Sequence, residues 1–152
     1  MIALQLTQKE TALLKDLKDQ EKMCADKYTR HSSCASDPQL KNLFSQIGTA
    51  EQQHLDLLNQ LSAGTVPTPP AGSSVLPTFT ATHTAETPEK QNDAYLCSDV
   101  LATEKHASAL YDTCIFEFTD ENARKLLNSI QSQEQNHGKM LYDYMTANQM
   151  YG

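Results

Sequence analysis

The sequence has no long apolar run. No stretch approaches the roughly 18–20 consecutive apolar residues that span a membrane. The N-terminal residues also lack the basic segment, the apolar stretch and the small-residue cleavage site of a secretion signal. We therefore expect a protein of the cytoplasm that has no membrane partner.

The sequence also has no cluster of basic residues. It contains 12 Lys and Arg against 19 Asp and Glu, a formal net charge of −7. Binding to nucleic acid needs a basic patch, so we expect no nucleic-acid partner. The acidity is compatible with attracting cations, but it is also typical of an ordinary soluble surface.

The chain has four cysteines but no C-x-x-C pair. The sequence therefore encodes neither a rubredoxin-type iron site nor a zinc knuckle. Disulfides are rare in the cytoplasm, so we expect reduced and half-buried thiols. The four residues are Cys24, Cys34, Cys97 and Cys114.

What the sequence does contain is a duplicated pattern of glutamate and histidine. Two Glu-x-x-His pairs, at 51/54 and 134/137, each follow a lone glutamate, at 21 and 104, by 30 residues. On a helix, residues i and i+3 project from the same face, so each pair can bind one ion together. A single pair is a weak signal because both residue types are common on helix surfaces. Two pairs in equal register form a strong one.

The duplication extends beyond these residues. When 13–62 is laid on 96–145, twelve of fifty positions are identical, including Tyr28 and Tyr111. Composition alone would give roughly three or four identities. We interpret this as one helical hairpin repeated. Two unrelated amphipathic hairpins would share leucines, but not both histidines and both tyrosines.

Four helices are predicted in one domain that spans residues 1–152. The signals that begin them are a capping box after Thr7, Asp37-Pro38, Thr87-Pro88 and Asp120. Hairpin one covers 8–62, with helices at 8–34 and 38–61. Hairpin two covers 88–147, with helices at 88–118 and 121–147.

Residues 63–87 form a linker that contains four prolines and no periodic pattern. A helix of about 25 residues is ~38 Å long, whereas 25 irregular residues can reach up to ~80 Å. The linker can therefore cross the whole bundle, so that the second and third helices run parallel. We expect a weakly packed surface strap, with the two histidines of the pairs within roughly 10 Å of one another.

The duplicated residues occupy positions that the helical pattern assigns to the core. Buried carboxylates without a counter-charge are costly, but four ionised carboxylates balance two divalent cations. Oxygen ligands with one imidazole per ion favour iron or manganese, with zinc as an alternative. The predicted ligands of this dinuclear site are Glu21, Glu51, His54, Glu104, Glu134 and His137.

Within this site we expect Glu51 and Glu134 to bridge the two ions, because they lie closest to the bundle axis. Glu21 and Glu104 would be terminal ligands, and each histidine would bind one ion. Two alternatives stay open. The residues could lie on the polar edges of their helices, or the site could be degenerate and hold one ion, a different ion or none.

Five further aromatic or imidazole side chains need an interpretation. Tyr28 and Tyr111 lie seven residues after the lone glutamates, on the same faces. They could hydrogen-bond the ligand carboxylates, take part in radical chemistry or simply fill the core. His31 and His83 have no partner at a recognisable spacing, and His106 should point to solvent.

The ligand layout resembles the ferritin-like superfamily, especially bacterioferritins and rubrerythrins. That resemblance implies a four-helix bundle with a di-iron or di-manganese centre that reacts with oxygen or peroxide. Several segments also resemble the Coat F family. The members of that family are spore coat-associated proteins of ferritin-like fold. These segments are Gln20-Glu21-Lys22, Asp37-Pro38-Gln39-Leu40, Leu141-Tyr142-Asp143-Tyr144-Met145 and Met150-Tyr151.

The resulting hypothesis is an all-α, spore-coat-related, ferritin-like protein with a dinuclear iron or manganese site. Its chemistry would involve oxygen or peroxide, and no catalytic residue is assigned. The alternative is a structural or interaction protein of the spore coat with a structural or degenerate metal site. We expect it to associate with a second copy or with spore coat proteins, and its location to be the cytoplasm or the spore coat.

Overall fold

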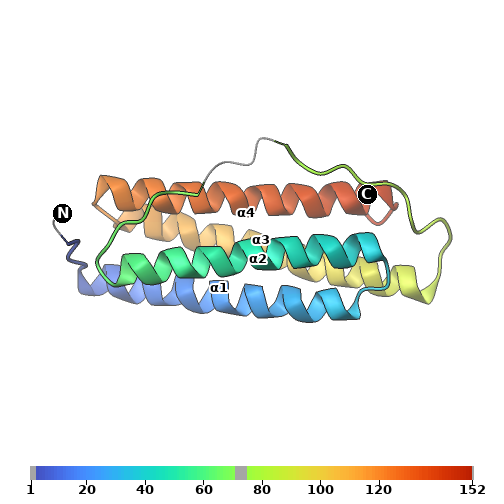
Figure 1. Cartoon of the computed structure of the whole chain (residues 1–152), viewed down its shortest axis with the longest axis horizontal. Coiled ribbons are helices and arrows are strands. Elements are labelled where there is room, and N and C mark those ends of the chain that lie inside the picture. The colour runs from blue at the N-terminus through green and yellow to red at the C-terminus, as the bar shows by residue number, and fades with distance from the viewer. Residues whose placement is uncertain (1–2, 71–74, 152) are drawn as a thin grey trace.

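The described part of the chain, residues 3–70 and 75–151 of a computed structural model, is a bundle of four helices (Figure 1). They are α1 (Gln8–Cys34), α2 (Pro38–Ser62), α3 (Pro88–Glu117) and α4 (Glu121–Ala147). No strand occurs in these residues, which confirms the all-α class. The ends lie within one residue of those predicted. None of these helices is long and apolar enough to cross a membrane.

Each helix begins at the polar residue that the sequence indicated. Thr7 and Glu10 form a reciprocal capping box, in which each backbone N–H donates to the other side chain, at 2.9 and 3.0 Å. Asp37 caps α2 by accepting from the backbone N–H of Gln39. Thr87 and Asp120 cap α3 and α4 in the same manner. These bonds satisfy amide groups that have no partner within the helix.

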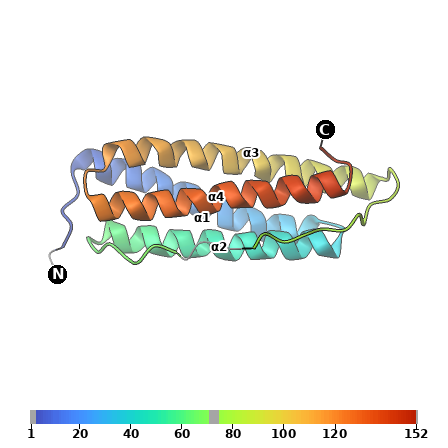
Figure 2. The same cartoon turned by 90° about the horizontal axis from the view of Figure 1, so that it is seen from above.

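The direction of the helices follows the crossover predicted for the linker. In Figures 1 and 2, α2 and α3 run parallel, and the linker leads from the end of α2 to the opposite end of the bundle, where α3 begins. Helix α1 packs against α2 and α3, and α4 packs against α3 and α2. This arrangement places the middle of all four helices at one level.

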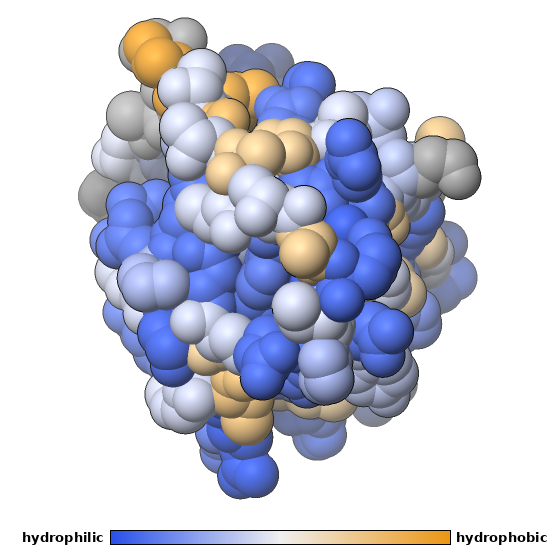
Figure 3. Space-filling view, turned by 90° about the vertical axis from the view of Figure 1, so that its right-hand side faces the viewer, coloured by the Kyte–Doolittle hydropathy of each residue, from blue (hydrophilic) through white to orange (hydrophobic). Residues whose placement is uncertain are grey.

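Apolar side chains fill the bundle in two layers, one towards each end. The layer at the α1–α2 turn includes Leu40, Phe44 and Tyr144. The other layer includes Leu14, Leu61 and Leu127. Seen end-on, the surface at the α1–α2 turn is mostly polar, with a few apolar patches (Figure 3). The two apolar layers leave a polar level between them at mid-length.

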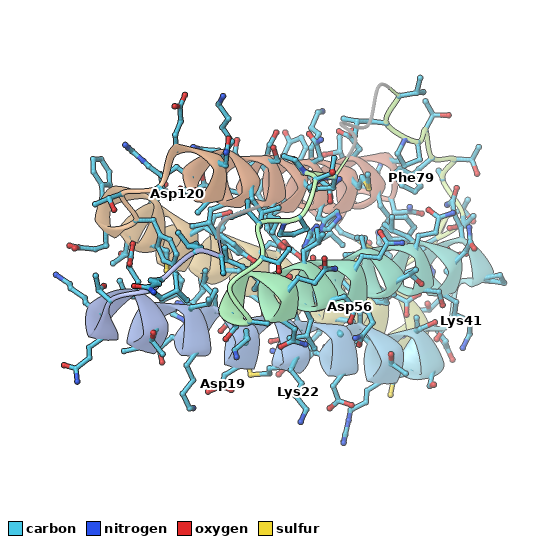
Figure 4. The ribbon with its side chains drawn as sticks, turned by 60° about the vertical axis from the view of Figure 1, so that its left-hand side comes forward. Asp19, Lys22, Lys41, Asp56, Phe79 and Asp120 are labelled. Atoms are coloured by element: carbon cyan, nitrogen blue, oxygen red, sulfur yellow. The ribbon has the colours of Figure 1, made fainter. Side chains whose placement is uncertain are left out.

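The second part of the linker is packed rather than loose. The Phe79 ring (labelled in Figure 4) lies edge-on to Tyr144, with 5.6 Å between ring centroids. The backbone N–H groups of Thr82 and His83 donate to the Asn148 side chain, at 2.8 and 2.9 Å. The expectation of weak packing is therefore wrong for residues 79–83. Residues 71–74, which share that expectation, lie outside the described residues.

This packing belongs to a network of polar side chains at one end of the bundle. The Asp93 carboxylate of α3 accepts from the backbone N–H groups of Ser36 and Asp37, at 2.8 and 3.1 Å. The hydroxyl of Tyr144 donates to Asp37 Oδ2 at 2.6 Å. Thr82 donates to the same oxygen. The network joins the linker to the α1–α2 turn and to the ends of α3 and α4.

Candidate metal centre

The structure brings all six predicted ligand residues together at the polar level. Each helix contributes: α1 one glutamate, α3 one glutamate, and α2 and α4 a Glu-x-x-His pair each. All are buried, with exposed fractions of 0 to 5%. The residues are Glu21, Glu51, His54, Glu104, Glu134 and His137. They do not lie on the polar edges of their helices, which removes that alternative.

The six residues form two overlapping groups. In each group, four side chains offer ligand atoms that all lie within 4.8 Å of one another. Glu51 and Glu134 belong to both groups, as expected for carboxylates that bridge two ions. Glu21 and His54 complete the first group, and Glu104 and His137 complete the second.

Both histidines turn their Nδ1 atoms towards the carboxylates. Nδ1 of His54 lies 3.0 Å from Glu21 Oε2 and 2.8 Å from Glu134 Oε1. Nδ1 of His137 lies 2.7 Å from Glu51 Oε1, at an angle that does not make a hydrogen bond. The two rings stack with 5.8 Å between their centroids. The predicted proximity of the two histidines is thus confirmed.

Two of the glutamates favour the protonated form. Burial raises the pKa of Glu21 well above its ordinary value, and the charges of Glu51 and Glu134 add to the effect. Burial and the neighbouring Glu134 raise the pKa of Glu104 to about 8. Both groups would be carboxylic acids at neutral pH when no cation is bound.

The other two glutamates favour the ionised form. Burial acts to raise the pKa of Glu51, but the nearby His137 and His54 lower it below its ordinary value. Burial also acts to raise the pKa of Glu134, but Glu104 and the same two histidines lower it.

The histidines show the opposite balance. Burial would lower their pKa values, but the carboxylates that face them raise both well above the ordinary value. The cluster therefore balances its own charge with two imidazolium groups, two carboxylates and two carboxylic acids.

Several buried polar atoms of the cluster have no hydrogen-bond partner among the described residues. Five are carboxylate oxygens, from all four glutamates, and one is a histidine nitrogen. A buried polar atom without a partner costs about 1–3 kcal/mol. Six such atoms in one place therefore need an explanation. They are Glu21 Oε1, both oxygens of Glu51, Glu104 Oε2, Glu134 Oε2 and His137 Nδ1. Once deprotonated, these oxygens and the imidazole nitrogen would supply the lone pairs that a divalent transition metal binds, so the residues fit such an ion.

The two tyrosines differ from one another. The hydroxyl of Tyr28 donates to Glu104 Oε1, a carboxylate oxygen of the cluster, at 2.8 Å. The hydroxyl of Tyr111 is buried and has no hydrogen-bond partner in the described part of the chain. Glu21, the glutamate at the matching position, turns Oε2 towards His54.

Sequence reasoning missed several polar pairs. His31 pairs with Asp99, and His83 pairs with Asp93, each with a 2.7 Å contact from Nε2. His54 Nε2 lies 2.5 Å from the side-chain oxygen of Gln133. The partners come from different segments of the chain, so no local spacing could have indicated them. His106 is exposed, as expected.

The cysteines lie outside both groups of ligand residues and are all free. Cys24, Cys97 and Cys114 are fully rather than half buried, and Cys34 is exposed. Cys24 lies three residues after Glu21. Burial, with the charges of the four glutamates, raises the pKa of its thiol. It therefore stays protonated beside the cluster.

Comparison with known proteins gives one match. Residues 92–152 match the Coat F domain. The matched segment includes Glu104, Glu134 and His137, whereas the ligand residues of hairpin one lie outside it. No curated protein and no solved structure matches the chain. The second hairpin is therefore similar to the Coat F domain, and the resemblance to the ferritin-like superfamily stays a prediction.

Proposed function

We propose that this chain is a ferritin-like protein that binds two transition-metal ions, iron or manganese, between its four helices. The observation that carries the proposal is the convergence of six buried ligand residues in two groups that share Glu51 and Glu134. The buried oxygens that have no partner among the described residues support it further.

The charge and the chemistry of the donors favour these metals. Four ionised carboxylates balance two divalent cations, and each group has one imidazole and three carboxylates. Hard oxygen ligands with a single imidazole suit iron or manganese, and zinc is the alternative. Ion binding would require both histidines to be neutral at Nδ1 and all four glutamates to be ionised.

The chain's own residues would position and enclose the ions. Glu51 and Glu134, which belong to both groups, would help to hold both ions. Tyr28 would hold Glu104 through the 2.8 Å hydrogen bond. The apolar layers on both sides of the polar level would exclude water. When bound, iron or manganese would supply redox chemistry with oxygen or peroxide.

A structural role in the spore coat is the second candidate. One observation favours it, since every residue of the cluster is at most 5% exposed. The directions of the pKa shifts would also allow the cluster to balance its charge through protonation. Such a cluster can hold four helices together with or without ions. In this case ions would add stability without turnover.

The similarity to the Coat F domain supports a location in the spore coat under either candidate. The partners would then be other spore coat proteins or a second copy of the chain.

The experiment that tests the proposal is a measurement of metal content. The protein should be purified after growth with added iron or manganese, stripped with a chelator and then reloaded under reducing conditions. We expect close to two ions per chain by elemental analysis. A protein that takes up neither metal would rule out the dinuclear site.

Consumption of peroxide or oxygen separates the two candidates. A loaded protein that consumes either one faster than the same amount of free metal supports the enzyme. A loaded protein that consumes neither supports the structural role.

A further inference from the structure

The two histidines of the candidate metal centre differ in the hydrogen bonding of Nε2, the ring nitrogen that points away from the carboxylates. His54 turns Nδ1 to the carboxylates, and its other nitrogen, Nε2, lies 2.5 Å from the side-chain oxygen of Gln133 on α4. Because an oxygen can only accept, this contact keeps a hydrogen on Nε2, so that in the neutral ring Nδ1 would be the nitrogen whose lone pair binds an ion. The contact also fixes the orientation of the ring.

His137 lacks the matching support. The position that precedes Gln133 by the repeat of 83 is Ala50, which has no polar side chain. No hydrogen bond to His137 Nε2 is found within residues 3–70 and 75–151. His137 instead borders a cavity of about 190 Å³ between α2 and α4, which Ala50, Met140 and Gln133 also line, whereas His54 does not.

The carboxylates of the two groups do not offset this difference between the histidines. Both groups share Glu51 and Glu134. Glu104, the remaining carboxylate of the His137 group, is held by Tyr28, and Glu21, in the His54 group, contacts His54 itself. The asymmetry between the two groups thus lies mainly in the histidines and in the cavity next to one of them.

We infer that Gln133 is a positioning residue that makes the two metal positions unequal. The ion at His54 binds first and more tightly. The ion at His137 binds second, and exchanges more readily because the cavity adjoins its ligand. This inference rests on the proposed function, because it concerns the same two ions.

Stepwise titration of the metal-free protein with Mn²⁺, followed by electron paramagnetic resonance, tests it. We expect two resolved steps in the unmodified protein. In Gln133→Ala, the first step should weaken by about 10- to 100-fold, the usual effect of losing a partner of a ligand histidine. The second step should stay within about twofold.

Gln135→Ala is the matched control. Gln135 flanks Glu134 on the other side, on the same helix, but is exposed. Both steps should remain unchanged in this variant. Circular dichroism of each metal-free variant checks that the helices are retained.

Ala50→Gln provides the reverse test, and it does not depend on the folding of the first variant. It offers His137 the acceptor that His54 already has, so the second step should strengthen towards the first.

The outcomes separate the inference from the proposed function. If the unmodified protein binds two ions in one unresolved step of equal affinity, or if Gln133→Ala weakens both steps alike or neither, the inference is wrong while the dinuclear site stands. If the unmodified protein binds no ion, the proposed function fails and the inference fails with it.

Discussion

At the scale of single residues, the direction in which a side chain points from its helix separates the buried glutamates from the charged residues next to them in the sequence. Asp19 and Lys22 point away from the bundle on either side of Glu21, which is fully buried (Figure 4). The helix turns about 100° per residue, so adjacent positions face different environments. A charged side chain is therefore solvated at one position and buried as a candidate ligand one or two positions away.

The shared carboxylates should be the most sensitive positions for metal binding. Glu51→Gln and Glu134→Gln each remove a charged oxygen from both groups while keeping the volume of the side chain. We expect each variant to lose dinuclear binding, measured as ions per chain by elemental analysis. Glu89→Gln, an exposed glutamate in the first turn of α3, is the control. Equal metal content in all three variants would show that these residues are not ligands.

Loss of the hydroxyl group should change the free energy of unfolding differently at the two tyrosines. Tyr28→Phe removes the bond to Glu104 and should lower the free energy of unfolding by about 1–2 kcal/mol. Tyr111→Phe removes a buried hydroxyl that has no partner in the described residues, so it should be neutral or stabilising. Urea denaturation of the metal-free variants measures both. Equal losses would mean that Tyr111 also has a hydrogen-bond partner.

At the scale of elements, the second part of the linker and the start of α2 depend on the same carboxylate. Asp37 caps α2 and also accepts from Tyr144 and Thr82, so one side chain joins α2, α4 and the linker. The loss of this carboxylate would affect all three.

Acid should remove the contribution of Asp37 to stability. Burial acts to raise its pKa, but the hydroxyls of Thr82 and Tyr144 donate to it and lower the pKa below the ordinary value of 3.8. A lowered pKa in the folded state means that the carboxylate stabilises the fold above about pH 4. That contribution is lost as the pH falls further, through the folded pKa.

Denaturation of Asp37→Asn at a series of pH values measures this contribution. The difference in the free energy of unfolding from the unmodified protein should be largest near pH 6 and should shrink between about pH 4 and pH 2. A difference that does not change with pH would show that the charge of Asp37 does not matter.

Phe79 should stabilise the bundle although it belongs to the linker. Phe79→Ala removes a partly buried ring that contacts Tyr144. We expect a loss of about 1–2 kcal/mol, less than for a fully buried phenylalanine. Thermal denaturation should show a melting temperature lower by about 2–8 °C. Thr84→Ala, at an exposed linker position, is the control, and an equal effect in both variants would contradict the docking of the linker.

At the scale of the whole molecule, the parallel course of α2 and α3 brings the halves of the repeat to one level. This direction depends on the crossover, because a short loop after α2 would have reversed α3. The candidate metal centre is therefore a property of the whole bundle, since each group of potential ligands takes residues from three helices.

Metal loading should accordingly stabilise the whole bundle. An ion that binds only the folded state adds about 2.7 kcal/mol when its free concentration is 100 times the dissociation constant. For a chain of this size that corresponds to a rise of about 5–10 °C in melting temperature. Calorimetry with and without Mn²⁺ measures the shift, and a chelator should reverse it. An unchanged melting temperature would contradict binding between the helices.

The sequence by itself determined the helices and the candidate ligands. Caps such as Thr7 and Asp37 depend on neighbouring residues, so their signals are local and the helix ends could be predicted to within one residue. The repeat indicated the candidate ligands. Glu21 and Glu104 precede the two Glu-x-x-His pairs by the same number of residues, so both sets of residues take equivalent positions on their helices.

Only the tertiary structure decided the contacts between distant segments. Tyr28 bonds Glu104 while Tyr111 has no hydrogen-bond partner in the described part of the chain, although the two tyrosines occupy equivalent positions in the repeat. His54 contacts Gln133, 79 positions away, and His83 of the linker contacts Asp93. Each contact depends on how helices approach one another and how side chains rotate to fill the space between them. Local spacing contains no information about either, so the difference in hydrogen bonding between the two halves of the cluster is seen only in the folded chain.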